Sequence, residues 1–357
     1  MNKKATYRVI GIMSGSSLDG LDIADCSFEQ ANSRWHYRIE HADTIPYDNQ
    51  LAGRLTELKE ASAETFAYTD IQLGRFIGNA INRFIRTYNS GKVDYIASHG
   101  HTVFHNPSQG YSTQIGNGAI IAASTNIPSI TDFRSLDVAL GGQGAPLVPI
   151  GDACLFPEYD YCLNLGGYSN ISFDQNGTRV AFDICPVNKA INYLANQAGQ
   201  IMDRDGKMAS QGSVDERLLE NLNNLGFYHS PAPKSLGDEW LNTTFLKVLK
   251  DASHLSIKDQ LRTVYEHIAI QIHEASAGNS EGSILVTGGG AYNHFLMDRI
   301  LERNNNRIIV PESKLVEFKE ALIFAFMGVL RSKGINNCLA SVTGASGDSS
   351  GGVIYLV

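Results

Sequence analysis

The stretch GIMSGSSLDGLDIA, residues 11–24, joins two strand-like segments through a turn rich in glycine, serine and aspartate. Glycine held in an ordered position costs backbone entropy, so such a cluster needs a physical reason. One reason is an ordinary tight hairpin, because Asp and Ser favour turns. The other is a turn whose backbone N–H groups and serine hydroxyls bind an anion. Because the stretch matches neither a P-loop nor a dinucleotide-binding fingerprint, both interpretations stay open.

Asp19 and Asp22 lie in or beside this turn. Their carboxylates would repel a bound phosphate group. They fit the anion-binding interpretation if a divalent cation lies between them and the phosphate, directly or through water.

Glycine turns recur at two later places. LNLGGYSNIS (163–172) and ILVTGGGAYN (284–293) both run from an apolar strand into glycines, and the second then enters a predicted helix. Each turn alone is compatible with a plain turn. Turns in the two halves of the chain would clamp a polyphosphate if they faced each other across a cleft, and a helix N-terminus favours negative charge.

The order of predicted elements indicates the fold. Each half of the chain begins with three strand-like segments, at 6–12, 22–28 and 34–47 and again at 159–167, 169–174 and 178–186. Helices then alternate with buried strands. This pattern predicts an α/β protein with two similar domains and a cleft between them. The Gly/Pro-rich stretch 140–153 is the expected crossover between domains. We expect one lobe from residues 1–135 plus about 332–357, and the other from 136–331.

Composition excludes several classes of protein. The chain has 357 residues, 43% hydrophobic and 18% charged, with a net charge of -8. Its length predicts two domains, and its acidity argues against a protein that coats nucleic acid or anionic membrane. The N-terminus does not resemble a signal peptide, and the apolar run 321–330 is too short to span a bilayer. Five widely spaced cysteines without a CxxC pair favour a reducing cytoplasm over a disulfide framework or zinc site.

Several polar side chains are candidates for chemistry. Asp183 ends a strand in AFDICPVNKA (181–190), where a carboxylate can act as general base or simply start an Asx turn. His99 lies in a histidine-containing loop that fits a sugar-binding or structural role better than a metal site. Arg134 can clamp a carboxylate or form an interdomain salt bridge. Glu320 lies in an apolar helix, where an acid needs a hydrogen-bonding partner.

In chain order these segments resemble the anhydro-N-acetylmuramic acid kinases of the actin/Hsp70/sugar-kinase superfamily. The resemblance runs nearly end to end through GIMSGSSLDGLD, SHGHTVFH, QIGNGAIIA, TDFRSLDVALGGQGAPLVP, LNLGGYSNIS, AFDICPVN, PKSLGDEW, VTGGGAYN, KEALIFAFMG and SVTGASG. It implies two ribonuclease-H-like (actin-like ATPase) domains with an interdomain cleft, ATP and Mg2+ as cofactors, and a cytoplasmic homodimer in cell-wall recycling.

The resemblance also implies roles for residues. The ATP-binding residues would be Gly15, Ser16, Ser17, Leu18, Asp19, Gly20, Leu21, Asp22, Gly166, Gly167, Ser169, Asn170, Gly288, Gly289, Gly290 and Asn293. Mg2+ would bind Asp19 and Asp22, directly or through water. The substrate-binding residues would be His99, Thr102, Arg134, Gln143 and Glu320, with Arg134 on the lactyl carboxylate. Asp183 would be the catalytic base.

The implied reaction opens a ring and transfers a phosphoryl group. A water activated by Asp183 attacks the anomeric carbon of the 1,6-anhydro sugar, and the released O6 takes the γ-phosphoryl group. The products are N-acetylmuramate 6-phosphate and ADP. The glycine turns suit this chemistry, because phosphoryl transfer relies on positioning and charge neutralisation.

The sequence departs from the family pattern at three places. Ser16 replaces a threonine and keeps its hydroxyl. DICPVN (183–188) replaces Asp-Thr-Gly-Pro-Gly-Asn, which removes a hydroxyl and two glycines beside the expected base. Asp238 stands where arginine is commoner. The second departure leaves open a related anhydrosugar substrate or a weakened enzyme.

Two other functions remain candidates. One is a kinase of the same fold that acts on an ordinary sugar or another anhydrosugar such as levoglucosan. The other is a nucleotide-dependent binding protein in the manner of actin or Hsp70, which would need a peptide-binding or polymerising segment that is not visible in the sequence.

Overall fold

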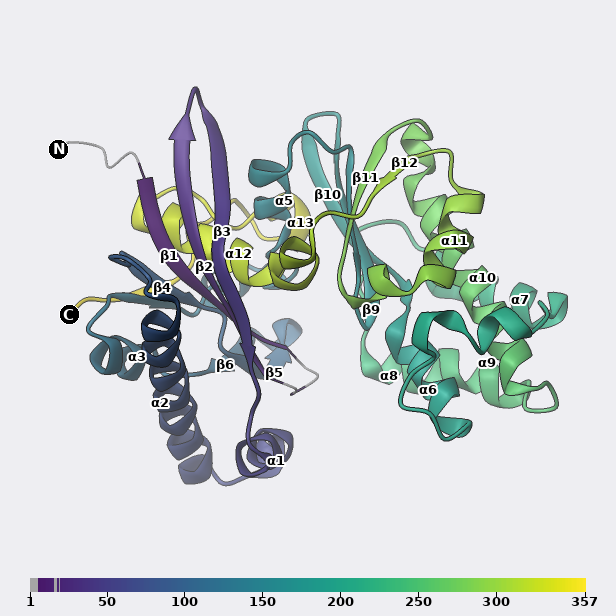
Figure 1. Cartoon of the computed structure of the whole chain (residues 1–357), viewed down its shortest axis with the longest axis horizontal. Coiled ribbons are helices and arrows are strands. Elements are labelled where there is room, and N and C mark those ends of the chain that lie inside the picture. The colour runs from purple at the N-terminus through teal and green to yellow at the C-terminus, as the bar shows by residue number, and fades with distance from the viewer. Residues whose placement is uncertain (1–5, 16–17, 19) are drawn as a thin grey trace. The chain divides into compact units, whose positions relative to one another are not determined.

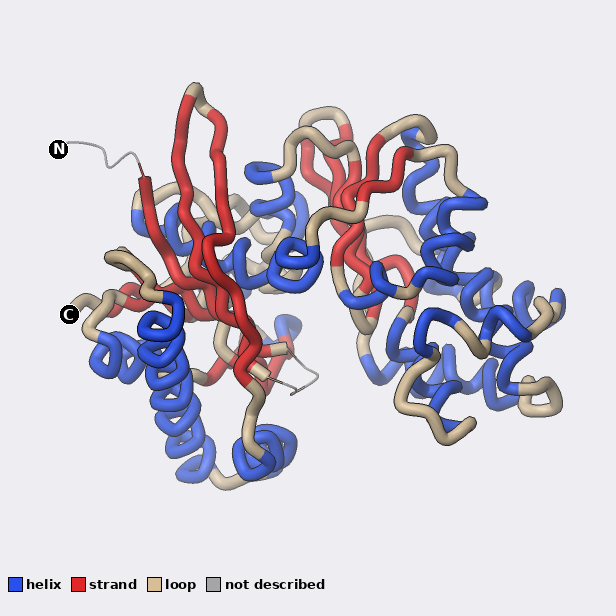
Figure 2. The backbone as a smooth tube through the Cα atoms, viewed as in Figure 1, coloured by secondary structure: helices blue, strands red, loops and turns tan. Residues whose placement is uncertain are grey.

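The structure is a computed structural model that describes residues 6–15, 18 and 20–357. The chain forms two compact units. Unit 1 comprises Met1–Phe156 and Phe318–Val357, and unit 2 comprises Pro157–Glu317. Unit 2 is therefore an insertion into unit 1, and each unit has its own sheet (Figures 1 and 2).

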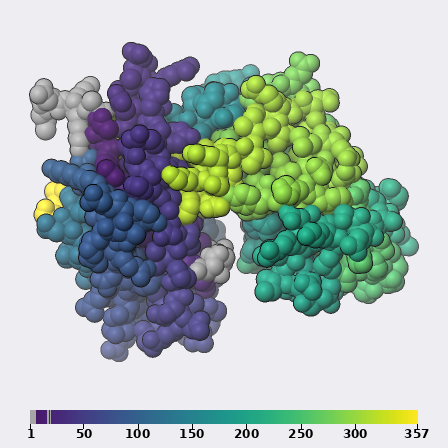
Figure 3. Space-filling model, in the orientation of Figure 1, coloured from purple at the N-terminus to yellow at the C-terminus, as the bar shows by residue number. Residues whose placement is uncertain are grey.

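Unit 1 is built on a six-stranded sheet with the order β13-β7-β4-β1-β2-β3. Its strands are β1 (Thr6–Ser14), β2 (Leu21–Ala31), β3 (Arg34–Ile45), β4 (Tyr95–Ser98), β7 (Ser129–Thr131) and β13 (Val353–Tyr355). The first three strands pair antiparallel, whereas β4 pairs parallel with both β1 and β7. The β2–β3 hairpin extends beyond the rest of the sheet, and its tip protrudes from the surface (Figures 1 and 3).

The remaining elements of unit 1 pack around this sheet. They are α1 (Asn49–Glu57), α2 (Ala63–Tyr88), β5 (His101–Asn106), β6 (Tyr111–Ile115), α3 (Gly118–Thr125), α4 (Ser135–Ala139), α5 (Pro149–Leu155), α12 (Ser313–Ser332) and α13 (Ala340–Thr343). Local signals fix α2, because Ser62 caps its N-terminus and Asn89 ends it in the left-handed conformation, with φ 48°. Helical spacing then buries one apolar side of α2 against Ile10 and Ile12.

Helix α12 covers the other side of β1. A side chain at Gly11 would place its Cβ 1.9 Å from the carbonyl oxygen of Ala321, and one at Gly328 would lie 2.7 Å from Ala97 Cβ. Two glycines therefore let the apolar helix lie directly on the centre of the sheet. This contact makes α12 from Phe318 onward part of the core of unit 1.

Unit 2 has a five-stranded sheet with the order β10-β9-β8-β11-β12. Its strands are β8 (Tyr161–Leu165), β9 (Tyr168–Gln175), β10 (Thr178–Pro186), β11 (Ser283–Thr287) and β12 (Arg307–Ile309). Its helices are α6 (Asn188–Gln197), α7 (Glu216–Asn223), α8 (Asp238–Trp240), α9 (Leu246–Asp251), α10 (Ile257–Ser276) and α11 (His294–Arg303). Tyr265 and Ile268 on α10 are fully buried in the same core as Val286 on β11.

The two sheets share one topology. In each unit three antiparallel strands are followed by two parallel strands, which gives the order third, second, first, fourth, fifth. Unit 1 adds β13 at its far edge, antiparallel to β7. This order is that of a ribonuclease-H-like domain, so the expected α/β fold with two such domains is confirmed.

The boundaries between the units differ from those expected from the sequence. Residues 136–156 and 318–331 belong to unit 1, whereas the sequence predicted them in the second lobe. For the first segment, α5 packs on unit 1, where a Cβ at Gly151 would lie 2.5 Å from the Ile323 side chain. The second segment is the part of α12 that lies on Gly11.

Within the described residues, no helix is long and apolar enough to cross a membrane.

Candidate active site

Three loops of unit 2 leave one edge of its sheet. Because β8 pairs antiparallel with β9, and β9 antiparallel with β10, strands β8 and β10 run in the same direction. Strand β11 pairs parallel with β8. The carboxyl ends of β8, β10 and β11 therefore meet at one edge, where α/β proteins bind ligands. The loops that follow these strands contain Gly166-Gly167, Val187 and Gly288–Gly290.

Asp183 is held near this edge by a loop from elsewhere in unit 2. Its backbone N–H donates to the Lys234 carbonyl at 3.0 Å, and the Leu236 N–H donates to Asp183 Oδ2 at 2.8 Å. Burial raises the pKa of Asp183 to about 6, while the hydrogen bond from Leu236 acts in the opposite direction. A carboxylate with this pKa is mostly ionised at pH 7 and is still basic enough to accept a proton.

The Gly166-Gly167 turn closes on the start of α6. The Gly167 carbonyl accepts from the Val187 N–H at 2.9 Å, and the Gly166 carbonyl accepts from the Asn188 N–H at 3.2 Å. Asn170 lies opposite Asp183 in the pairing of β9 with β10. The turn is thus tied to the segment that carries the expected base.

Two residues expected to bind ATP make structural hydrogen bonds within unit 2. Ser169 is fully buried, and its hydroxyl donates to the Cys185 carbonyl at 3.1 Å and accepts from the Cys185 N–H at 3.3 Å. The Asn293 side chain accepts from the Leu296 N–H at 3.1 Å, which caps α11, and donates to the Tyr265 hydroxyl at 2.7 Å. Their polar side chains therefore hold β9–β10 and α11 in place.

Close packing of the turn 288–290 against β8 requires glycine at two of its three positions. Gly288 has φ 85°, and a Cβ there would lie 2.6 Å from Asn164 Oδ1, while one at Gly290 would lie 2.8 Å from Leu165 Cβ. A Cβ at Gly289 would meet no atom closer than 4.0 Å. The first and third glycines are thus needed by the fold, and the middle one leaves the backbone accessible.

The described part of the first glycine turn lies at the end of β1. Leu18 has φ 56°, and its N–H donates to the Gly15 carbonyl at 3.4 Å. Gly20 is buried against the Ile45 carbonyl, and Leu21 is a fully buried core residue, so its side chain serves packing. Asp22 Oδ1 accepts from the Thr44 hydroxyl at 2.6 Å. The expected contacts of Ser16, Ser17 and Asp19 lie outside the described residues.

A hydrogen-bond network at the end of β1 was not predicted from the sequence. The Tyr47 hydroxyl donates to Ser14 Oγ at 2.7 Å, and this oxygen lies 3.2 Å from His101 Nδ1. Tyr47 follows β3 and His101 begins β5, and no spacing in the sequence relates these residues to Ser14. The network fixes the Ser14 side chain immediately before the turn.

His99 and Arg134 form a second polar cluster in unit 1. His99 Nδ1 lies 2.8 Å from the Gly100 carbonyl, which only accepts, so Nδ1 carries the proton. His99 Nε2 then accepts from Arg134 Nε at 3.0 Å and Nη2 at 2.7 Å, and Arg134 Nη1 donates to the Gly144 carbonyl. Burial and then the Arg134 charge lower the pKa of His99. The histidine is therefore neutral and orients the arginine.

The other expected substrate residues have different degrees of exposure. Thr102 accepts from Gln114 Nε2 at 3.2 Å, whereas the Gln143 side chain is exposed.

Burial raises the pKa of Glu320, the neighbouring Lys319 lowers it, and the Asp22 carboxylate raises it further. The effect of Asp22 on Glu320 indicates that the two carboxyl groups face the same region of unit 1, and carboxyl oxygens are ligands that a hard divalent cation prefers. Among the described residues, no three acidic, histidine or cysteine side chains form a metal cluster.

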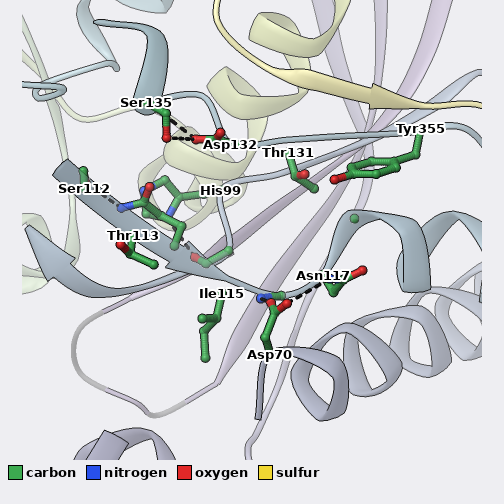
Figure 4. Close-up of a pocket in the computed structure, with 14 residues that line it drawn as sticks. Asp70, His99, Ser112, Thr113, Ile115, Asn117, Thr131, Asp132, Ser135 and Tyr355 are labelled. Carbon is green, nitrogen blue, oxygen red and sulfur yellow. Dashed lines mark hydrogen bonds between the residues drawn. The ribbon is translucent and has the colours of Figure 1, made fainter. Parts of the chain in front are cut away.

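A cavity of about 300 Å³ lies beside His99 in unit 1 (Figure 4). Its walls come from the residues after β4 and β7 and from the segment 112–118. Asp70 accepts from the Gly116 N–H and the Asn117 amide, and Gln114 Oε1 is a buried acceptor without a hydrogen-bond partner in the described part of the chain. Among the described residues that line the cavity there is no lysine or arginine, and most of the polar lining groups are hydroxyls and amides, which suit a ligand with hydroxyl and amide groups.

The sequence model described as anhydro-N-acetylmuramic acid kinase matches residues 7–357. This chain belongs to the anhydro-N-acetylmuramic acid kinase family. The anhydro-N-acetylmuramic acid kinase of Pseudomonas syringae pv. syringae is 34% identical over 362 residues, which cover 97% of this chain and 98% of that protein. That of Vibrio cholerae is 35% identical over 364 residues, with 97% of each chain covered. The resemblance found in the sequence is confirmed.

The departures from the anhydro-N-acetylmuramic acid kinase pattern around Asp183 lie in the core. Ile184, Cys185 and Val187 are buried, and the pairing of β10 with β9 shifts between Asp183 and Cys185. Burial raises the pKa of the Cys185 thiol to about 12, which excludes a thiolate nucleophile beside the base. The three substituted side chains therefore pack in the apolar core of unit 2, and Asp183 stays near the carboxyl end of β10.

Asp238 stands where arginine is commoner in the anhydro-N-acetylmuramic acid kinases, and in this chain it forms an ion pair with Lys189. It accepts from Lys189 Nζ and, at 2.7 Å, from the Tyr168 hydroxyl. Lys189 lies against Gly167, since a Cβ there would be 3.2 Å from Lys189 Cγ. A cationic side chain is therefore present beside the second glycine turn, supplied by another position of the chain.

Proposed function

We propose that this chain is an ATP-dependent kinase that hydrolytically opens the 1,6-anhydro ring of 1,6-anhydro-N-acetylmuramic acid and phosphorylates O6. The observation that carries this proposal is Asp183, whose burial gives the carboxyl group a pKa of about 6 at the sheet edge of a kinase-family chain. The relatives named above are kinases of this anhydro sugar.

In the proposed reaction Asp183 accepts a proton from a water molecule. The water oxygen bonds to the anomeric carbon, and the bond between that carbon and O6 breaks. O6 then bonds to the γ-phosphorus of ATP, and the bond from that phosphorus to the bridging oxygen breaks. The products are N-acetylmuramate 6-phosphate and ADP. The Leu236 N–H holds the Asp183 carboxylate in one orientation for the first step.

For the nucleotide, we propose that backbone groups rather than side chains bind it in unit 2. Gly289 is exposed, Gly166 and Gly167 are half-buried, and Asn170 lies on the neighbouring strand β9. In unit 1, the turn from Gly15 to Asp22 is proposed to bind phosphate. Mg2+, when bound, neutralises phosphate charge, and Asp22 would hold it directly or through water, together with Asp19.

For the sugar, we propose that Arg134 binds the lactyl carboxylate. Its guanidinium is oriented by His99 and Gly144, and no carboxylate among the described residues forms an ion pair with it. Thr102, Gln143 and Glu320 are proposed to contact sugar hydroxyls. The buried acceptor Gln114 Oε1 in the neighbouring cavity would accept from a hydroxyl or the acetamido N–H.

The test is ADP formation with three sugars, followed by mass analysis of the product. We expect turnover with 1,6-anhydro-N-acetylmuramic acid, and a product that contains one added water and one phosphoryl group. Preference for N-acetylmuramic acid or levoglucosan would establish a different sugar kinase. ATP binding without sugar-dependent ADP release would favour a non-catalytic actin-like or Hsp70-like protein.

We also propose that the protein works as a cytoplasmic homodimer in peptidoglycan recycling. These three statements rest on the resemblance to the family. Light scattering of the purified chain tests the dimer, and accumulation of the anhydro sugar after deletion of the gene tests the role in recycling.

A further inference from the structure

Asp137 on α4 is a buried carboxylate that forms no direct ion pair with a described residue, although its charge acts on Arg134 at longer range. It is 1% exposed, and among the described residues no lysine, arginine or histidine lies within ion-pair distance. Three neutral donors satisfy it instead. Oδ2 accepts from the Gly144 N–H at 2.7 Å, and Oδ1 accepts from the Thr343 hydroxyl at 2.7 Å and the Cys338 thiol at 3.1 Å.

These contacts fix the loop that follows α4. The Asp137 carbonyl accepts from the Gly142 N–H at 2.9 Å, and a Cβ at Gly142 would lie 2.2 Å from Asp137 Oδ2. Gly144 has φ 64°, a conformation that suits glycine. The carboxylate therefore determines where residue Gly144 lies.

Gly144 in turn determines the orientation of Arg134. Its carbonyl accepts from Arg134 Nη1, while Nε and Nη2 donate to His99 Nε2. A guanidinium has five N–H groups, and these bonds use three of them. One N–H on each terminal nitrogen remains, which is the fork that binds a carboxylate through two hydrogen bonds.

We propose that Asp137 is a positioning residue that orients Arg134, through Gly144, for a carboxylate on the substrate. Burying a carboxyl group is costly, so its presence calls for a gain that an apolar residue would not provide. Asp137 does not touch the substrate. It makes the Arg134 fork rigid before the ligand arrives, and rigidity of this kind increases affinity. The inference rests on the proposed function, because it names the group that Arg134 recognises.

The test compares the anhydro sugar acid with its methyl ester, which lacks the negative charge. Dissociation constants are measured by calorimetry for the full-length protein and for Asp137→Asn. We expect the unmodified protein to bind the acid roughly 10- to 100-fold more tightly than the ester. Asp137→Asn should lose most of this preference, while its KM for ATP stays unchanged.

Two further variants separate positioning from stability. Thr343→Val removes one donor to Oδ1 and should reduce the preference partially, also if Asp137→Asn fails to fold. Arg134→Met should abolish the preference, and adding Asp137→Asn to it should have no further effect on the affinity ratio. A full preference for the acid in both Asp137→Asn and Thr343→Val would overturn the inference and leave the proposed function standing. Failure of the unmodified protein to bind acid or ester would overturn both.

Discussion

The Leu236 N–H donates a 2.8 Å hydrogen bond to Asp183 Oδ2, while the Asp183 N–H donates to the carbonyl of Lys234, two residues before Leu236. The carboxylate is thus held by a loop that is distant in the sequence but lies in the same unit. One bond orients the side chain and the other fixes the backbone of β10. This pairing is the physical basis of three predictions about Asp183.

Asp183→Asn should reduce kcat by about 10³-fold, within the range expected for loss of a general base. The amide oxygen can still accept from Leu236, so the loop keeps its place. ATP affinity, measured by equilibrium binding, should change less than about twofold because no nucleotide contact is removed. A variant with near-normal turnover would exclude Asp183 as the base.

The rate should depend on the ionisation of Asp183. Because burial raises its pKa to about 6, the carboxylate is the main form at pH 7.5 and the acid is the main form at pH 5. Under the proposed mechanism, kcat/KM should fall about tenfold per pH unit below this pKa. A flat profile between pH 5 and 7.5, with intact protein, would contradict the assignment.

The same carboxylate should lower stability at neutral pH. The folded-state pKa of about 6 exceeds the ordinary value of 3.8, so the folded protein binds the proton more tightly. The stabilising contribution is fully present below about pH 4 and is lost as the pH rises through 6. The free energy of unfolding of Asp183→Asn should therefore exceed that of the unmodified protein by roughly 2 to 3 kcal/mol at pH 8. Urea unfolding at pH 4 is the control, where this difference should vanish.

Gly288→Ala and Gly289→Ala form a matched pair. The first places a Cβ 2.6 Å from Asn164 Oδ1 at φ 85°, and we expect it to cost at least about 2 kcal/mol of unfolding free energy. The second meets no atom within 4 Å except Asn188 Nδ2 at that distance, so its stability should change by less than about 1 kcal/mol.

Nucleotide binding gives the second measurement for this pair. Gly289→Ala should raise the KM for ATP severalfold if the nucleotide lies against this backbone. An unchanged KM in a stable Gly289→Ala protein would remove the third glycine turn from the proposed nucleotide site.

Much of this arrangement could be predicted because it depends on local patterns. Strand alternation and turn residues predicted both meanders. Asp183 was expected to end a strand, but β10 continues past it to Pro186. The roles of Ser169 and Asn293 could not be predicted in this way. The register of a strand decides whether a serine hydroxyl points toward the neighbouring strand or away from it. The sequence also does not distinguish an asparagine that caps a helix from one whose amide binds a ligand.

Long-range contacts explain the remaining differences. Helix α12 is apolar on most sides, so its sequence does not indicate which sheet it covers, and the boundary was expected after it rather than within it. The link from Asp137 to Arg134 likewise depends on Thr343 and Cys338, which the chain brings back from its C-terminal segment.

The contact of Gly11 with Ala321 has a consequence for synthesis of the chain. The strand that carries Gly11 leaves the ribosome long before the helix that covers it, because Ala321 lies far along the chain from Gly11. Unit 2 is contiguous and can complete its core while β1 still exposes one apolar face. We therefore expect unit 2 to fold before unit 1. In a nascent chain that ends before residue 318, the apolar face of β1 should stay exposed because α12 is not yet present to cover it.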